Sequence, residues 1–441
     1  MNSKTEIVFP KVLIIDNFNQ KDANGITIRN LFLNWPKDKI AVAHKEQSLI
    51  SEIVVDNIEN YYLFGKKEIK YIWPFSLILK IADSKIINSN TLDFSINNLN
   101  AVSLKKQLSF KAKLFEFFKP VIYYSGLAYY QKKFILSEDL INWINEFNPD
   151  YIYSSAGSIS SIDFLCKVKK HFRYKLIIHT FDDYIQIHDN TFISKYLSRI
   201  INKKFRKLIE LADLCLVISD KMATEYNQRY NKTFFKFHNP IILNNWKNSS
   251  ANDKLDVFTF CYIGKINFDT NSTIGLFINT IEQLKIEGKK VDFHIYSQFT
   301  LNYWVSLIDS RVKKYYKGSL NHAEIPNTLS KYDGLLLPLN FEKENQKYLE
   351  LSLSTKTSEY MISKVPIFLI APHNFAVSEY LKNNDCAYCI NKVIDLKRGI
   401  LDFMIQDELR RNYLEKAYQL ALKEHTSDSV TQRLLVILNK L

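Results

Sequence analysis

The chain has 441 residues, of which 46% are apolar and 14% aromatic. This length exceeds what one hydrophobic core usually serves, so we expect two or three globular domains rather than a single domain or a disordered chain. No apolar run approaches the roughly 18 residues of a transmembrane helix, and none near the start resembles a signal peptide, so we expect a cytoplasmic protein that does not span a membrane. The net charge of +13 indicates an anionic partner, such as phosphate groups, nucleic acid or lipid head groups.

Short apolar runs alternate with helical patterns along the chain. Nearly continuous apolar runs are typical of strands covered on both faces, as in parallel sheets. The alternation therefore predicts an α/β protein. Residues 137–147 are a predicted helix that opens with Ser-Glu-Asp, and Asn321 with Glu324 resembles a capping box at another helix start. The predicted strands are residues 11–16, 39–44, 151–155, 175–180, 214–219, 258–264, 293–297, 334–338 and 366–370.

The predicted strands form two sets, separated by a polar stretch at residues 244–254 that is typical of a linker. We expect two Rossmann-like, doubly wound domains facing a cleft, at residues 1–243 and 257–425. The final helix, 426–441, is expected to pack back across the junction.

Residues 60–135 interrupt the alternation and are predicted to be an insertion in the first domain. Within it, residues 101–133 carry seven lysines and one acid, Glu116, interleaved with Phe and Tyr. This mixture suits a membrane interface, with rings at head-group level and lysines near anionic lipid. A helical subdomain with a solvated basic face explains it equally well. Residues 195–207 hold six basic residues and no acid, which we interpret as a solvated helix face.

The five cysteines do not form a disulfide framework, because they are odd in number and scattered along the chain. A reducing cytoplasm fits this pattern. Cys386 and Cys389 have the C-x-x-C spacing of a metal or redox site. No second ligand pair follows them, and two buried small residues in a strand are the alternative.

Polar residues after the strands of the first domain form one half of the candidate site, because ligands bind at the carboxyl ends of such strands. Gly25 lets the backbone approach a ligand closely, although an ordinary turn glycine is the alternative. We assign Thr27 to the same acceptor side. His179 ends a strand and is followed by Asp182 and Asp183, an arrangement suited to acid–base work. For His179 the alternative is a buried, hydrogen-bonded imidazole. We assign His179 and Asp182 to catalysis and Asp183 to the acceptor side.

The second domain supplies the other half. Gly264 and Lys265 end a strand, and the ammonium of Lys265 is expected to reach phosphate. An exposed, solvated lysine is the alternative. Gly318 and Ser319 stand at another strand end, where backbone groups are expected to meet a base or phosphate.

Residues 352–360, SLSTKTSEY, predict a helix start with Ser354 or Thr355 as the N-cap. Lys356 and Glu359 then lie three residues apart on one helix face. They form either a surface ion pair worth about 0.2–0.5 kcal/mol or an anion site. In the second case the helix N-terminus and Lys356 hold the anion, and Glu359 is ready for hydroxyl groups.

Four segments carry a resemblance to a known family: HTFDDY, YIGKI, YDGLLLPLNF and SLSTKTSEYMISKVPIFLIAP. In this order they resemble bacterial family 4 glycosyltransferases with the GT-B fold, of the kind found in cell-surface polysaccharide biosynthesis. Phe181-Asp182-Asp183-Tyr184 is similar to an M-D-D-W-like segment of such enzymes. The resemblance covers both domains except the 60–135 insertion.

The resemblance implies transfer of a sugar from a nucleotide-diphosphate-sugar with retention at the anomeric carbon, with no metal and no other cofactor. It places Lys265 and Lys356 at the donor diphosphate, and Thr355 in the same donor-binding segment. It places Glu359 at the ribose hydroxyls and His179 near the transferred sugar. Gly25 lies beneath donor phosphate and acceptor.

The chain departs from the family pattern at two donor-side positions. The family's first glutamate corresponds to Leu351, with Glu350 adjacent, and Asn271 lies near the place of a second phosphate-binding lysine. The sequence therefore does not identify the sugar.

The expected partners are the nucleotide-sugar, a glycan or polyprenyl-diphosphate-linked acceptor and an anionic membrane surface on the inner face of the plasma membrane. A sugar-nucleotide epimerase or a glycan phosphorylase on the same fold, and a non-catalytic protein, stay open as alternatives. A nucleic-acid-binding protein is a further alternative, although no nucleic-acid-binding motif is present and we expect no nucleic acid partner.

Overall fold

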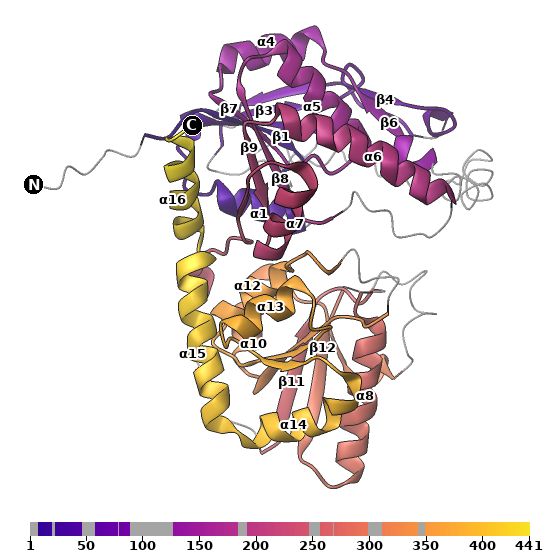
Figure 1. Ribbon diagram of the computed structural model, residues 1–441, viewed down its shortest axis with the longest axis vertical. Coiled ribbons are helices and arrows are strands. Elements are labelled where there is room, and N and C mark those ends of the chain that lie inside the picture. The colour runs from indigo at the N-terminus through magenta and orange to yellow at the C-terminus, as the bar shows by residue number, and fades with distance from the viewer. Residues whose placement is uncertain are drawn as a thin grey trace, which may run out of the picture. The chain divides into compact units, whose positions relative to one another are not determined.

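The computed structural model describes residues 8–19, 23–45, 58–77, 79–88, 127–183, 192–246, 256–267, 269–298, 311–342 and 349–441. The chain forms two compact units (Figure 1). The first comprises Met1–Val217, Ala223–Lys236 and Thr431–Leu441, and the second comprises Ile218–Met222 and Phe237–Val430. The domain bounds inferred from the sequence, 1–243, 257–425 and 426–441, stay predictions.

An eight-stranded sheet forms the centre of the first unit, in the order β10-β9-β8-β7-β1-β2-β3-β5. Its strands are parallel except for β5, which runs antiparallel to β3. Because the order reverses between β1 and β7, their carboxyl ends form the switch point where doubly wound sheets bind ligands. The strands are β1 (Val12–Asp16), β2 (Ile40–His44), β3 (Asn60–Leu63), β5 (Lys85–Asn88), β7 (Tyr151–Ser154), β8 (Lys175–Thr180), β9 (Leu214–Val217) and β10 (Phe234–Lys236).

The longer helices of this unit start where the sequence offers a cap. Ser137 accepts a hydrogen bond from the Leu140 N–H at 3.2 Å and caps α4. Leu140, Trp143, Ile144 and Phe147 recur at helical spacing and are buried, which confirms the helix expected at 137–147. The helices are α1 (Ala23–Leu31), α4 (Glu138–Phe147), α5 (Ile159–His171), α6 (Phe192–Leu211) and α7 (Asp220–Tyr230).

The insertion expected at residues 60–135 is wrong in part. Residues 60–63 form β3, which continues the main parallel sheet beside β2, and residues 85–88 form β5 at its edge. Strands this short carry too few residues for a clear period, so the alternation was missed. Two further strands, β4 (Ile69–Tyr71) and β6 (Lys132–Phe134), pair as an antiparallel ribbon. Most of the stretch predicted to meet a membrane, 101–126, lies outside the described residues.

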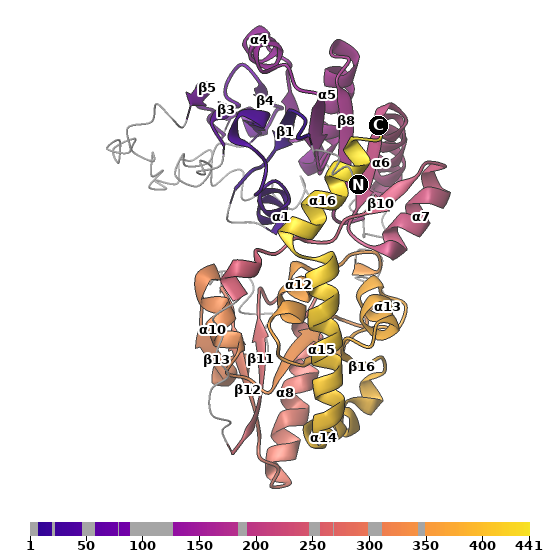
Figure 2. The same ribbon diagram turned by 90° about the vertical axis from the view of Figure 1, so that its left-hand side faces the viewer.

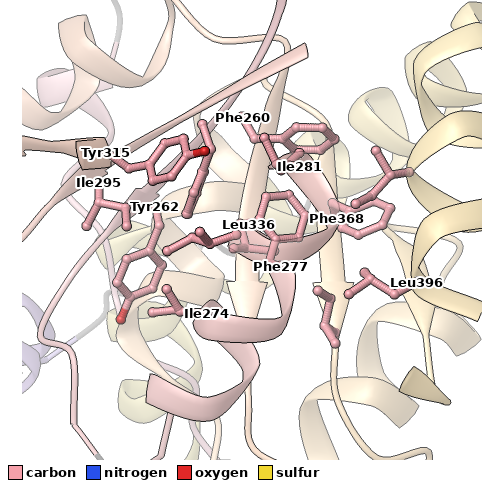
Figure 3. Close-up of a cluster of buried hydrophobic side chains, with 14 of the residues drawn as sticks. Phe260, Tyr262, Ile274, Phe277, Ile281, Ile295, Tyr315, Leu336, Phe368 and Leu396 are labelled. Carbon is pink, nitrogen blue, oxygen red and sulfur yellow. The ribbon is translucent and has the colours of Figure 1, made fainter. Parts of the chain in front are cut away.

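A six-stranded, wholly parallel sheet forms the centre of the second unit, in the order β13-β12-β11-β14-β15-β16. Its switch point lies between β11 and β14. The phenyl rings of Phe260, Phe277 and Phe368 pack together in its core, while the Tyr262 hydroxyl points away from them (Figure 3). The strands are β11 (Phe258–Ile263), β12 (Val291–Tyr296), β13 (Tyr316–Gly318), β14 (Gly334–Pro338), β15 (Ile367–Ile370) and β16 (Tyr388–Ile390).

Helices cover both faces of this second sheet, and α15 runs beside α12 (Figure 2). The capping box expected at Asn321 and Glu324 is confirmed. The helices are α8 (Asn271–Ile286), α9 (Val312–Tyr315), α10 (Ile325–Leu329), α12 (Thr355–Ile362), α13 (Ala376–Asn383), α14 (Leu396–Ile405), α15 (Asp407–Glu424) and α16 (Ser427–Leu438).

The end of the chain packs in the first unit. The hydroxyl of Thr431 donates to the Leu31 carbonyl at 2.9 Å, and the hydroxyl of Tyr151 donates to the Leu438 carbonyl at 2.7 Å. Within the part of the chain that the structure describes, no helix is long and apolar enough to span a bilayer. The two Rossmann-like sheets confirm the α/β fold class.

Candidate functional site

Gly264 follows β11 at the switch point of the second sheet. Its φ of +150° is a conformation that residues with a side chain rarely adopt. A Cβ atom at this position would lie 2.0 Å from Cε and 2.6 Å from Nζ of Lys356. The glycine is therefore required where it stands, because it leaves room for the Lys356 side chain over the end of β11.

Lys356 lies in the first turn of α12, whose N-cap is Ser354 as the sequence predicted. The Ser354 hydroxyl accepts a hydrogen bond from the Lys356 N–H at 3.3 Å. The Lys356 ammonium lies 5.3 Å from the centre of the Tyr262 ring, and no carboxylate of the described residues comes within ion-pair distance of it. The first turn of α12 also carries no acidic residue. A half-buried cation and the positive end of a helix thus coincide with no protein anion, which suits an anionic ligand.

Glu359, one turn further along α12, does not pair with Lys356. Its carboxylate lies 3.2 Å from Nε2 of His322, so the expected choice between surface pair and anion site is settled against the surface pair. The hydrogen bond to Glu359 raises the pKa of His322, with burial acting in the opposite direction. Sequence reasoning missed His322, although it lies in the same segment as Gly318 and Ser319. Its only signal was a polar position two residues before a capping glutamate.

The other donor-side predictions lie at ends of the same sheet. The Lys265 side chain is exposed, while its carbonyl accepts a hydrogen bond from the Tyr262 hydroxyl at 2.7 Å. Gly318 ends β13 with a φ of +115° and has open space around its Cα, and Ser319 is exposed. Thr355 is the half-buried first residue of α12. Their roles in donor binding stay predictions.

The two departures from the family pattern have structural explanations. Leu351 is 6% exposed, and its carbonyl accepts a hydrogen bond from the Ser219 hydroxyl at 2.6 Å. The neighbouring Glu350 carboxylate accepts a hydrogen bond from the Asn374 amide at 3.3 Å and lies 3.7 Å from the Lys221 ammonium. Glu350 is therefore held by partners within the unit and does not stand in for a glutamate at position 351.

Asn271 opens α8 and is tied to the end of β14. Its side-chain oxygen accepts a hydrogen bond at 3.0 Å from the amide of Asn340, which is fully buried. The Asn340 oxygen accepts in turn from the Thr273 N–H at 3.1 Å. The position near a second phosphate-binding lysine is thus occupied by a neutral, structural amide, which leaves Lys356 as the half-buried cation of this region.

His179 ends β8 in the first unit and is 1% exposed. Its Nδ1 lies 2.7 Å from the hydroxyl of Tyr153, and its ring packs against Phe181. Asp182 follows at the surface of this strand end and is half-buried. The buried, hydrogen-bonded imidazole matches the alternative given above, and catalytic roles for His179 and Asp182 stay predictions.

Asp183 is buried and forms an ion pair. Its carboxylate accepts hydrogen bonds from Nη1 of Arg229 at 3.0 and 3.1 Å and from the Tyr226 hydroxyl at 2.8 Å. Burial alone would lower the pKa of Arg229, but the charge and hydrogen bond of Asp183 outweigh it and raise the pKa. These contacts give Asp183 a structural task, and its assignment to the acceptor side stays a prediction. Tyr184 lies outside the described residues.

Gly25 and Thr27 lie in α1, where both are buried. A Cβ atom on Gly25 would come within 2.6 Å of the Asn19 carbonyl oxygen. This close approach of backbone to backbone explains the glycine without a ligand. Their acceptor-side role stays a prediction.

A buried ion pair at the first switch point was missed. The Asp16 carboxylate, at the end of β1, lies 3.2 Å from the Lys45 ammonium just after β2. Burial alone would raise the pKa of Asp16, but the charge of Lys45 and hydrogen bonds from Ser155 and Asn17 outweigh it and lower the pKa. The only sequence signal was an acid at the last position of a buried strand.

Among the residues that the structure describes, no group of three or more His, Cys, Asp or Glu side chains is placed to hold a metal ion.

Comparison with known proteins matches residues 276–436 to the model of a glycosyl transferase-like family. HepE from Anabaena, solved with UDP and glucose, aligns with a TM-score of 0.60 at 11% identity over 98% of this chain and 100% of that chain. Sucrose-phosphate synthase from Thermosynechococcus elongatus aligns with a TM-score of 0.60 at 9% identity over 98% of each chain. TarM from S. aureus, solved with Fondaparinux, alpha-GlcNAc-glycerol and UDP, aligns with a TM-score of 0.58 at 11% identity over 97% of this chain and 100% of that chain. A search of curated proteins finds no significant match.

The family match and the shared architecture confirm the resemblance to GT-B glycosyltransferases. At identities near a tenth, the solved structures show the fold alone. The family match falls mainly on the second unit, which carries Lys356, Glu359 and His322.

Proposed function

We propose that the protein is a retaining, metal-independent glycosyltransferase that moves a sugar from a nucleotide-diphosphate-sugar to a glycan or a polyprenyl-diphosphate-linked acceptor. Cell-surface polysaccharide biosynthesis, such as that of capsule or O-antigen, is the setting that the resemblance implies. One observation carries the proposal: the Lys356 ammonium, with no carboxylate partner among the described residues, at the N-terminus of α12 beside Gly264. The UDP in the solved structures of HepE and TarM supports a nucleotide-sugar donor.

The diphosphate is the leaving group of this reaction, and its negative charge grows as the bond to the sugar breaks. Lys356 and the backbone N–H groups that open α12 are placed to stabilise that charge. Tyr262 supports the Lys356 ammonium from below, at 5.3 Å from its ring centre. Lys265, exposed at the same strand end, adds a second cation. Because these groups neutralise the diphosphate, we expect activity to persist when divalent metals are chelated.

Glu359 binds the nucleoside in this proposal. Its carboxylate accepts hydrogen bonds from the ribose hydroxyls and so orients the donor over Lys356. His322 holds the carboxylate in place at 3.2 Å when no donor is bound. Gly318, Ser319 and Thr355 contribute backbone and hydroxyl groups to the donor.

The acceptor side rests on the family resemblance. We assign His179 and Asp182 to the transferred sugar, and Gly25, Thr27 and Asp183 to the acceptor-side wall. Retention follows if the leaving phosphate takes the acceptor's proton, so that no protein nucleophile is required. Peripheral association with the inner face of the plasma membrane completes the proposal, because a lipid-linked acceptor lies there.

Thermal unfolding with a panel of sugar nucleotides tests the proposal. A true donor at 100 times its dissociation constant adds about 2.7 kcal/mol to the free energy of unfolding. We expect that stabilisation in the wild type and in Lys331→Ala, a control at an exposed lysine of the same unit. We expect it to be largely lost in Lys356→Ala. Stabilisation by no nucleoside diphosphate or sugar nucleotide, or the same stabilisation in Lys356→Ala, would overturn the proposal.

Product stereochemistry tests the finer statement. Nuclear magnetic resonance of the first product formed should show the anomeric configuration of the donor. An inverted product would contradict retention without touching the donor site. Release of free epimerised sugar nucleotide in the absence of acceptor would favour the epimerase alternative.

A further inference from the structure

A cavity of about 350 Å³ lies in the first unit, among β6, α5 and α6, apart from every residue assigned to sugar transfer. Figure 1 shows these three elements close together. Six lysines line the cavity: Lys132, Lys133, Lys167, Lys170, Lys204 and Lys207.

The lysines converge because of helical spacing. Asp163, Lys167 and Lys170 lie four and seven residues apart, on one face of α5, and Lys204 and Lys207 lie one turn apart on α6. Both faces border the same cavity.

One carboxylate lines the cavity, and it neutralises one lysine. The Asp163 carboxylate accepts two hydrogen bonds from the Lys204 ammonium, at 2.6 and 2.7 Å. Among the described residues, no carboxylate comes within ion-pair distance of Lys167, Lys170 or Lys207. Like charges held together repel one another, and an anion of two or more charges placed among them would remove the repulsion.

The base of the cavity is aromatic and firmly built. Phe134 is 4% exposed, and the Lys132 ammonium lies 5.3 Å from the centre of its ring. The Ser160 hydroxyl donates to the Lys132 carbonyl and so ties β6 to α5. Tyr130 lies at the rim. Cationic walls above an apolar base suit a phosphate group attached to a less polar moiety.

We propose that this cavity binds a phosphate-bearing anion. Two sources share that chemistry: the head group of an anionic lipid, and a soluble phosphate or diphosphate. Lys132 and Lys133 end the stretch 101–133 for which we predicted contact with anionic lipid, so the lipid source extends that prediction to a defined pocket. The solvated helix face inferred for residues 195–207 is then only part of the role of α6. Binding here does not depend on sugar transfer, because no donor-site residue lines the cavity.

Charge reversal on α5 tests the proposal. Lys167→Glu/Lys170→Glu changes two exposed side chains of the cavity wall, and Lys195→Glu/Lys203→Glu is the matched control, with the same charge change at two exposed lysines of α6 that do not line the cavity. Each full-length protein is co-sedimented with vesicles of phosphatidylglycerol and phosphatidylcholine, and titrated calorimetrically with inorganic pyrophosphate. Circular dichroism melting confirms folding. Asp163→Asn removes the one lining carboxylate and is expected to tighten binding.

The two arms distinguish the sources. We expect the affinity for one probe to fall at least about tenfold in Lys167→Glu/Lys170→Glu and clearly less in the control. A loss confined to the vesicles identifies a lipid head group, and a loss confined to pyrophosphate identifies a soluble anion. Equal losses in both double variants mean diffuse surface attraction and overturn the proposal, as does binding of neither probe by the wild type.

Cys166 offers a local readout, because its thiol lines the cavity and is half-buried. Burial raises the pKa of Cys166, the charge of Asp163 adds to this, and the charges of Lys207, Lys170 and Lys204 act in the opposite direction. An anion in the cavity would cover the thiol and offset those lysine charges. Alkylation of Cys166, followed by mass spectrometry, should therefore slow when the binding probe is present. An unchanged rate at saturating probe would place the bound anion elsewhere.

Discussion

Replacing Lys356 with alanine is expected to impair sugar transfer far more than it impairs folding. The folded protein loses one cation–π contact, with the ammonium 5.3 Å from the Tyr262 ring centre, and no ion pair among the described residues. Such a contact contributes about 0.5–1 kcal/mol at exposed sites. The free energy of unfolding should therefore fall by no more than about 1 kcal/mol.

The expected loss of activity is larger, because the ammonium acts on a doubly charged leaving group. A hydrogen bond to a charged group contributes about 1.5–3 kcal/mol. If that contribution is made mainly in the transition state, the rate falls roughly 10- to 150-fold. Diphosphate charge is greatest as the bond to the sugar breaks, so kcat and kcat/KM should fall together.

Steady-state kinetics with the donor identified by thermal shift measures this loss, and circular dichroism melting measures the stability. Lys331→Ala is the control for removing a lysine from the same unit, and Lys356→Arg keeps the charge. We expect wild-type kinetics for Lys331→Ala and partial activity for Lys356→Arg. A folded Lys356→Ala enzyme with unchanged kcat and kcat/KM would refute the reasoning, and residues 352–360 would then be an ordinary helix start.

Three further outcomes are expected. Glu359→Ala should raise the donor KM about 10- to 100-fold with little change in kcat, because a charged hydrogen-bond site worth about 1.5–3 kcal/mol binds the nucleoside in ground and transition states alike; a loss in kcat alone would contradict this. Glu359 raises the pKa of His322 above 6.5, so their pairing is fully present below the unfolded value and is lost as pH rises through the folded value. The donor KM should therefore decrease over that rise as Glu359 is released, and His322→Ala should abolish the dependence; a dependence that persists in the variant speaks against it. Gly264→Ala places a methyl group 2.0 Å from Cε of Lys356 and forces a strained φ costing about 1–3 kcal/mol, so kcat/KM should approach that of Lys356→Ala and the double variant should be no worse than either alone; additive losses would disprove the coupling.

Local patterns were sufficient to predict most of the framework. The strands expected at 175–180 and 334–338 have these bounds in the structure, and the others are shifted by one or two residues. A buried parallel strand is recognisable because both of its faces are apolar, which is a property of five or six neighbouring residues. The short strands β10, β13 and β16 have three residues each, too few to carry a period, and were missed.

The candidate site was predictable only where its chemistry is contained in one segment. Residues 352–360 show a cap, a lysine and a glutamate in a single turn, so the helix start and an anion site were both visible. The family resemblance added roles for these residues, but it did not show what Glu350 or Leu351 contact. In the structure Glu350 accepts a hydrogen bond from Asn374, and Leu351 is buried.

The sequence by itself determined the fold class and the cap and charge of one helix start, because periodicity and capping depend on neighbouring residues. Only the tertiary structure decided which distant residues meet. It placed Gly264 against Lys356, paired His322 with Glu359 and gathered the lysines of β6, α5 and α6 around one cavity. Each of these contacts joins segments tens of residues apart, and no local pattern contains such a contact, because chain packing alone brings the segments together.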